Sequence, residues 1–247
     1  RRALSTGDFG TKSSSSKVGV AQVLSRLTYI SSLSHLRRIN TPIDKSGKLV
    51  PPRKLHSTSW GYLCPAETPE GHSVGIVKNL SYMAHVTIPS NSASLYDYIE
   101  PHVITFEEME SDHHELLHGV RVYVNGCPLG NAKNPLELYK DLKEKKHKGI
   151  INIYTSIIFD IKCKEIRVCN EAGRLTRPVL RVRGNRLLLA RDHVLALRDK
   201  KLSWDDLLTD IKNQDAVIEY IDPAEQNLSM IAMRPTDLIS TSGSMLY

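Results

Sequence analysis

The sequence lacks any long hydrophobic run. No stretch approaches the roughly 18 apolar residues needed to cross a bilayer, and Arg1-Arg2 does not open a signal peptide. We therefore expect a soluble intracellular protein that contacts no membrane. Its 247 residues, 40% of them hydrophobic, are enough for one or two compact domains. Because the first residue is not Met and residues 237–247 contain no closing element, we expect a fragment of a longer chain.

Cysteine is scarce, and its spacing fits no metal site. The cysteines include no C-x-x-C pair and no even framework of a short secreted chain: Cys64, Cys127, Cys163 and Cys169. Neither zinc nor disulfide bonds are supported, and reduced thiols fit best. Four histidines also lack the spacing of zinc ligands: His35, His56, His72 and His85. We interpret His113-His114, which has acidic neighbours, as part of a solvated acidic segment.

Motifs of independent catalysis are missing as well. The chain contains no P-loop, no G-x-S-x-G element and no D-x-D pair of catalytic metal ligands. The sequence therefore gives no support to an enzyme that works alone.

Positive charge is plentiful, but only in the first third of the chain. Residues 1–88 carry 12 Lys and Arg against four Asp and Glu, a net charge of +8. The remaining 21 basic and 23 acidic residues leave a net charge of −2. A polyanionic partner is therefore expected to bind to residues 1–88.

The pattern of apolar residues predicts a mixed α+β fold in at least two modules. Four elements are expected in the basic third: a serine-rich loop over residues 6–16, a helix or helix pair between Val20 and Leu36 interrupted at Ser31-Ser32, a loop over residues 40–48 and a half-buried strand over residues 80–88. Residues 89–118 have the weakest pattern, so we place a domain boundary there.

The pattern is clearer in the second part of the chain. Asn125-Gly126 predicts a hairpin turn. A helix is expected from Pro135, capped by Asn134 and ended by Gly149. Strands are predicted around residues 151–158, 165–169, 179–182 and 217–221, and a short helix is predicted after Ser203.

The densest polar constellation lies in three short segments, residues 36–40, 52–56 and 64–71. Their arginines stand out because a planar guanidinium grips a phosphate or carboxylate with paired hydrogen bonds, whereas lysine offers a point charge. Two interpretations remain open. The arginines bind phosphates, or they are solvated loop charges with an internal ion pair to Glu67 or Glu70.

The segment Pro65-Ala-Glu-Thr-Pro-Glu-Gly71 is predicted to be a stiff acidic turn. Pro65 and Pro69 fix the backbone and Gly71 ends the turn, which would hold Glu67 and Glu70 in defined directions. Paired carboxylates suit acid–base work or magnesium binding. With so many arginines nearby, we expect them to orient those arginines instead.

These motifs together resemble a known family. Several segments are similar to the fork region of the second-largest subunit of multisubunit DNA-directed RNA polymerase of the eukaryotic polymerase II type: residues 34–42, 52–56, 60–61, 64–71 and 75–80. The element at residues 64–71 also resembles one in the bacterial beta subunit. Looser matches resemble the two external domains of the family: residues 121–126, 171–178 and 219–222.

The resemblance implies an organisation and a function. Residues 1–88 would be the fork region with two loops, residues 89–200 the first external domain, and residues 201–247 the start of a truncated second one. The chain would line the active-centre cleft of a nucleotidyltransferase that makes RNA on a DNA template, and it would be inactive alone. Magnesium would be bound mainly by another subunit. The expected partners are the largest polymerase subunit, other polymerase subunits, the DNA template, the RNA–DNA hybrid and ribonucleoside triphosphates.

The resemblance also assigns roles to single residues. The side chains expected close to substrate or nucleic acid are Arg37, Arg38, Lys45, Lys48, Arg53 and Glu70. Arg53 and Glu70 would arrange the triphosphate network, and Arg38 would lie along nucleic acid or pair with Glu70. Lys45 and Lys48 would meet phosphates where the downstream duplex separates. The residues expected to form the structural turn are Pro65, Glu67, Pro69 and Gly71.

Two questions stay open at the level of sequence. Residues 183–201 depart from the cellular polymerase II pattern, which makes a large DNA virus an expected source beside a cellular one. The location would then be a virion, or the host cytoplasm or viral factory, rather than the nucleus. The alternative function is a nucleic-acid-binding module without any polymerase context.

Overall fold

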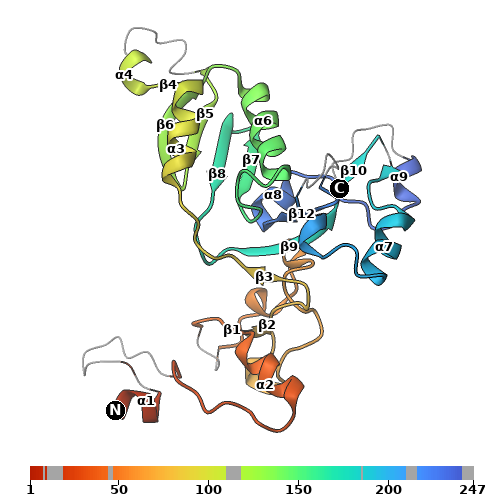
Figure 1. Ribbon diagram of the computed structural model, residues 1–247. Helices are drawn as coiled ribbons and strands as arrows, with labels where there is room; N and C mark the ends of the chain where they lie inside the picture. Colours follow the sequence, from red (N-terminus) through yellow and green to blue (C-terminus); the bar gives the residue numbers. More distant parts are fainter. Residues whose placement is uncertain are drawn as a thin grey trace. The chain divides into compact units, whose positions relative to one another are not determined.

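The computed structural model describes residues 1–7, 9, 19–43, 47–109, 118–184, 186–209 and 216–240. The chain divides into two compact units (Figure 1). The first consists of Arg1–Leu55 and Leu63–Ser81, and the second of His56–Tyr62 and Tyr82–Tyr247. Helices and strands are mixed along the chain, which confirms the predicted α+β class.

The first unit is built from short elements. They are α1 (Arg2–Thr6), α2 (Tyr29–Leu36), β1 (Arg38–Asn40), η1 (Pro51–Arg53), η3 (Gly71–Ser73) and β2 (Val77–Asn79), where η marks a 3-10 helix. The strands β1 and β2 are antiparallel, with Arg38 opposite Asn79 and Asn40 opposite Val77. This ribbon joins the end of α2 to the segment that follows the acidic turn.

The helix α2 begins later than we predicted. Residues 19–28 form no helix, and α2 starts after Thr28. Thr28 and Ser31 make a capping box, in which Ser31 N–H donates to Thr28 Oγ1 at 3.1 Å and Thr28 N–H donates to Ser31 Oγ at 2.9 Å. The Ser31-Ser32 pair that we interpreted as an interruption therefore belongs to the first turn of the helix. The apolar spacing from Val20 onward was misleading, because Val20 is 58% exposed.

The structure has short elements in two other regions where we predicted a longer strand or no regular structure. Of the strand predicted over residues 80–88, only β3 (His85–Val86) is present, and Tyr82 is 94% exposed. The weakly patterned stretch of residues 89–118 contains regular structure, namely α3 (Ala93–Ile99), η4 (Glu100–His102), β4 (Val103–Ile104) and α4 (Phe106–Met109). These elements are too short to produce a clear period in the sequence.

The larger sheet of the second unit has five strands in the order β4-β6-β5-β8-β7. Its other strands are β5 (Arg121–Val124), β6 (Cys127–Ala132), β7 (Ser156–Asp160) and β8 (Glu165–Cys169). The neighbours β5 and β8 are parallel, and the remaining neighbours are antiparallel. Parallel strands need a crossover connection, which here contains β6, α6 (Pro135–His147) and β7.

The hairpin between β5 and β6 and the helix α6 confirm the predictions. Asn125 and Gly126 have φ angles of 50° and 79°, as a two-residue hairpin turn requires. The helix α6 follows Asn134 and begins with Pro135. Gly149, with φ of 73°, lies just beyond its end.

One face of this sheet is covered by both α3 and α6 (Figure 1). The shared core takes residues from the sheet and from the two helices, all between 0 and 6% exposed: Val122, Val124, Ile157, Ile166, Val168, Leu95, Ile99, Leu138 and Leu142. On the opposite face, Arg121 and Glu165 form an ion pair at 2.8 Å. The alternation of apolar and polar residues in β5 and β8 follows from this one-sided cover.

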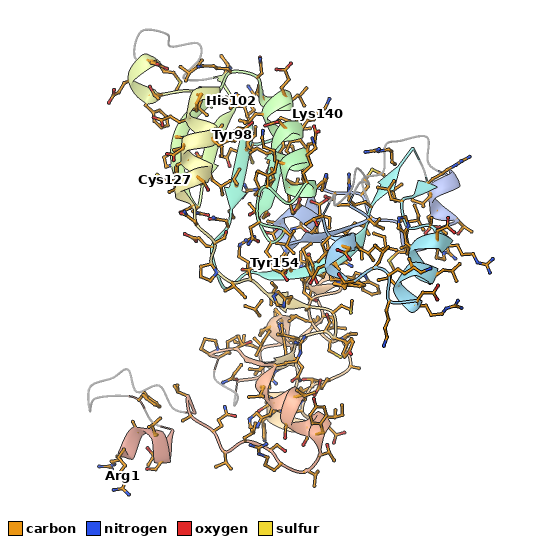
Figure 2. The ribbon with its side chains drawn as sticks, in the orientation of Figure 1. Arg1, Tyr98, His102, Cys127, Lys140 and Tyr154 are labelled. Carbon is orange, nitrogen blue, oxygen red and sulfur yellow. The ribbon has the colours of Figure 1, made fainter. Side chains whose placement is uncertain are left out.

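A second, antiparallel sheet has the order β12-β9-β3, with β9 (Leu175–Leu180) and β12 (Ile218–Ile221). Tyr154 lies near this sheet (Figure 2). Its ring centroid is 4.9 Å from that of His85 on β3 and 4.9 Å from that of Tyr220 on β12. The other elements of the unit are η2 (Ser57–Ser59), β10 (Val182–Arg183), β11 (Arg186–Leu187), α7 (Arg191–Arg198), η5 (Asp205–Leu207), α8 (Pro223–Asn227) and α9 (Asp237–Ser240). No helix within the described ranges combines the length and hydropathy that a bilayer crossing requires.

A buried ionic cluster connects α6 to β12 and α8. Lys143 Nζ donates to Glu219 Oε1 at 2.7 Å and also contacts Glu225, while Lys146 Nζ lies 3.0 Å from Glu219 Oε1. His147 Nε2 lies 2.9 Å from Glu219 Oε2. All four charged side chains are at most 10% exposed. Because a buried charge needs a partner, the cluster fixes α6 against the second sheet.

Replacing Glu219 by Gln should therefore destabilise the second unit strongly. The change leaves two buried ammonium groups short of a carboxylate, and breaking such a pair costs about 3–5 kcal/mol. The matched control is Glu165→Gln at the partly exposed pair with Arg121, which should cost under about 1 kcal/mol. Urea unfolding of the purified chain measures both. Equal losses for the two variants would contradict the role of the cluster.

The same cluster predicts lower stability in acid. Burial lowers the pKa of His147 from its ordinary 6.5, although Glu219 partly offsets this. Burial alone would raise the pKa of Glu219, but Lys146 and Lys143 hold it well below 4.5. For both groups the unfolded chain binds protons first, so their contribution is present above the unfolded pKa and is lost as pH falls. Burial raises the pKa of Glu225, which acts in the opposite sense.

His147→Gln isolates the first part of this dependence. Between about pH 5 and 6.5, the free energy of unfolding should fall with pH less steeply in the variant than in the unsubstituted chain. Urea titrations at several pH values give this slope. An unchanged slope would show that His147 is not neutral in the folded chain.

Candidate functional site

The acidic turn, residues 65–71, is fastened to β2 by Asn79. Cys64 N–H donates to the carbonyl of Asn79 at 2.9 Å, and Asn79 Nδ2 donates to the carbonyl of Glu67 at 3.1 Å. Asn79 is only 3% exposed. The entry to the turn is thus fixed by a buried amide, a residue that our sequence reasoning did not single out.

Thr68 closes the turn from inside. Its Oγ1 donates to the carbonyl of Val77 at 3.1 Å and accepts from Gly75 N–H at 2.9 Å. The position between Pro65 and Pro69 is a signal that sequence reasoning overlooked, since a hydroxyl in a stiff turn readily bonds nearby backbone. Gly71 has φ of 82°, which explains why glycine ends the turn.

Arg53 is held by backbone carbonyls. Its guanidinium donates to the carbonyl oxygens of Gly47 at 3.0 Å, Leu49 at 3.1 Å, His72 at 2.7 Å and Val74 at 3.0 Å. These acceptors come from the stretch before η1 and from η3 and its end. Arg53 therefore braces one loop against the exit of the acidic turn.

Gly75 makes this brace sterically feasible. Its φ is 69°, and a Cβ there would lie 2.3 Å from the carbonyl oxygen of Arg53. Since real Cβ atoms do not approach backbone so closely, position 75 requires glycine.

The two adjacent arginines of the constellation have different surroundings. Arg37 is half-buried at the end of α2, and its Nη2 donates to the carbonyl of Ser81 at 2.7 Å. Arg38 is exposed at the start of β1. Among the residues that the structure describes, no group accepts a hydrogen bond from the Arg38 guanidinium or pairs with it. Arg38 thus presents free donors.

The carboxylates of the turn do not orient the arginines. Glu67 accepts a hydrogen bond from Ser34 Oγ of α2, and Glu70 is exposed at the start of η3. Within the described part of the chain neither one forms an ion pair. The expected ion pair between Arg38 and Glu70 is therefore absent between these two described side chains, and backbone carbonyls do the orienting that we had assigned to carboxylates.

The remaining predicted site residues are two lysines. Lys48 is exposed just before the segment that leads to η1. Lys45 lies outside the described residues.

A chain of contacts connects most of these predicted residues within the first unit. Arg53 bonds the exit of the acidic turn, the turn bonds β2, and β2 pairs with β1, which begins at Arg38. Backbone carbonyls and a side-chain amide make these connections.

The described residues contain no group suited to a resident metal ion. No three or more His, Cys, Asp or Glu side chains come together in the described ranges in a way that would hold a metal. Glu67 and Glu70 thus belong to no such group among the described residues.

The sequence of the chain matches models of known protein families. Family models described as RNA polymerase Rpb2, domain 3, domain 4 and domain 5 match residues 22–86, 122–183 and 204–246 in that order. The first match contains every predicted site residue. The chain belongs to the RNA polymerase Rpb2 family.

Similar proteins include Rpb2 subunits from distant organisms. The chain is 42% identical to DNA-directed RNA polymerase II subunit RPB2 of Encephalitozoon cuniculi, over 98% of this chain and 21% of that subunit. It is 36% identical to DNA-directed RNA polymerase II subunit 2 of Arabidopsis thaliana, over 96% of this chain and 20% of that subunit. It is also 36% identical to DNA-directed RNA polymerase subunit 2 of Acanthamoeba polyphaga mimivirus, over 95% of this chain and 19% of that subunit. The chain spans about a fifth of the length of these relatives.

The geometry predicts that Arg53 cannot be replaced by lysine. Arg53→Lys keeps the charge but loses the planar fork that reaches several carbonyls. Each lost hydrogen bond costs about 1 kcal/mol, so the loops should open more readily by roughly 2–3 kcal/mol. Hydrogen exchange of the amides in residues 47–53 and 72–76 should therefore accelerate.

The matched control is Arg38→Lys, the same change at an exposed arginine. It should leave exchange in those two segments unaltered. If both variants exchanged alike, the carbonyl brace would not be the role of Arg53.

Proposed function

We propose that this chain is part of the second-largest subunit of a DNA-directed RNA polymerase and forms one wall of its active-centre cleft. The observation that carries the proposal is that Rpb2 matches run through the chain and cover the whole arginine constellation. The relatives are themselves named as DNA-directed RNA polymerase subunits. No observation favours a nucleic-acid-binding module outside a polymerase.

Within this function, Arg38 is the candidate for direct contact with a phosphate. Its guanidinium is exposed and free of described partners, whereas four carbonyls already occupy Arg53. Phosphoryl transfer is promoted mainly by positioning and by neutralising negative charge. The excess of positive charge in residues 1–88 supports the same surface. Lys45 and Lys48 add cations for the phosphates of downstream DNA.

Arg53 and the acidic turn fix the backbone that supports this surface. Arg53 keeps its loop against the exit of the turn, and Thr68 and Asn79 keep the turn on β2. Glu70 remains exposed at the end of the turn, where it can accept hydrogen bonds from groups of the triphosphate network. The turn thereby positions Glu70 relative to the strand pair that carries Arg38.

The rest of the activity is proposed to come from other parts of the assembly. Magnesium, which neutralises phosphate charge, would be held mainly by the largest subunit, as the family resemblance implies. Nucleic acid, nucleotides and the other polymerase subunits are the proposed partners. The chain alone should not polymerise RNA. It would act in the nucleus, or in a virion or viral factory if its source is viral.

Arg38→Ala and Glu70→Ala, introduced into the assembled polymerase, should slow nucleotide addition more than they weaken promoter binding. Loss of one charged hydrogen bond costs about 1.5–3 kcal/mol, or roughly ten- to a hundredfold in rate. Single-turnover elongation measures the first effect and promoter retention measures the second. The control is Lys162→Ala, which removes one exposed cation outside the basic segment.

Unchanged elongation rates in both variants would refute the assignment. A loss of nucleic-acid binding at an unchanged rate of addition would support the binding-module alternative.

A further inference from the structure

The segment His56–Tyr62 separates the two halves of the candidate site, yet it folds with the other unit. Arg53 and the acidic turn belong to the first unit, whereas His56–Tyr62 belongs to the second. Only Lys54 and Leu55 separate Arg53 from this segment, and only Leu63 and Cys64 separate it from Pro65. Contacts that hold residues 56–62 therefore act close in sequence to Arg53 and to the acidic turn.

Tyr62 is the buried end of this segment. It is 1% exposed, and its hydroxyl donates to the carbonyl of Ile221, the last residue of β12, at 3.2 Å. Burial raises the pKa of the phenol far above its ordinary value, so it stays protonated and keeps donating. The guanidinium of Arg177 on β9 lies over the ring, 5.7 Å from its centroid.

Arg177 holds the residues before Tyr62 as well. Its Nε donates to Gln226 Oε1 of α8 at 2.8 Å, and Gln226 Nε2 donates to the carbonyl of Trp60 at 3.4 Å. Gly61 has φ of 79°, and a Cβ there would lie 2.6 Å from Arg177 Cδ. The side chain of Arg177 thus occupies the space that the missing Cβ leaves. Two motifs that are far apart in sequence, Trp60-Gly61 and Arg177-Pro178, meet here.

We propose that Arg177 is a positioning residue for nucleotide addition. By gripping residues 60–62, it restrains the chain end that leads to the acidic turn, and the exit of that turn is bonded to Arg53. The two residues between Tyr62 and Pro65 span at most about 3.6 Å each, so movement of Tyr62 changes where the turn begins. This role rests on the proposed polymerase function and adds a residue about 100 positions away from the constellation in sequence.

The test uses the assembled polymerase with three forms of this chain, Arg177→Ala, Gly61→Ala and the double variant. Arg177→Ala should lower the rate of single-turnover nucleotide addition on the order of ten- to a hundredfold, because small misplacements of positioning groups have effects of that size. Its control is Arg198→Ala in the same unit. The side chain of Arg198 is 73% exposed and, within the described part of the chain, pairs only with the neighbouring Asp199. That control should leave the rate unchanged. The amount of assembled enzyme is measured for each form, and rates are expressed per assembled molecule.

The double variant distinguishes a grip from general damage. The added Cβ at Gly61 meets Arg177, so the two changes should be coupled, and the double variant should lose less than the product of the two single losses. Multiplicative losses, or a rate per assembled molecule equal to that of Arg198→Ala, would overturn the proposal.

A second readout separates this proposal from the function on which it rests. Hydrogen exchange of the amides in residues 47–55 and 63–75 should accelerate in Arg177→Ala and stay unchanged in Arg198→Ala. If Arg38→Ala and Glu70→Ala slow nucleotide addition but Arg177→Ala changes neither the rate nor the exchange, the proposal for Arg177 is wrong and the polymerase function is unaffected. If none of these variants changes the rate, the polymerase role fails, and exchange in the two segments still decides whether Arg177 holds them.

Discussion

The hydrogen bonds from the Arg53 guanidinium to backbone carbonyls are the interaction on which the candidate site depends. A guanidinium that donates to several carbonyls is fixed in direction, and those donors cannot also grip a ligand. Here those donors connect residues 47–49 to residues 72–74. Arg53 is therefore a structural residue, and the exposed Arg38 is the one that we propose to contact phosphate. Among the residues that the structure describes, no arginine pairs with Glu67 or Glu70.

The second unit holds its charged side chains in a different way. Its lysines on α6 are buried and need carboxylates, which β12 and α8 supply as Glu219 and Glu225. In the basic unit, by contrast, charge remains at the surface and polar backbone does the holding. The contrast follows from burial, because a charge out of water must be paired whereas an exposed one is solvated. This difference agrees with the separation of net charge along the sequence.

Sequence patterns predicted best where an element carries its own start and stop. The helix from Pro135 to His147 and the turn at Asn125-Gly126 follow from local rules of capping and backbone conformation, and both are present. The helix expected from Val20 is absent, because apolar spacing alone does not show which residues another part of the molecule covers. Ser31 was misjudged because a serine inside a helix and a serine at its start look alike without the partner Thr28.

The candidate site shows the same limit. The motifs identified the region, and the resemblance assigned its family, but the partner of each arginine depends on contacts between segments distant in sequence. Backbone carbonyls carry no sequence signature, so the acceptors of Arg53 were invisible beforehand. The small polar residues Thr68 and Asn79 were overlooked for a similar reason, since their effect comes from where they are buried.

The most direct test of the account is an experimental structure of the complete polymerase with DNA, RNA and an incoming nucleotide. In that structure we expect an Arg38 nitrogen to lie within about 3.2 Å of a phosphate oxygen, while Arg53 keeps its carbonyl acceptors. If Arg38 instead faces bulk solvent or a carboxylate, and Arg53 leaves the carbonyls to reach the phosphates, the assigned roles of the two arginines are wrong.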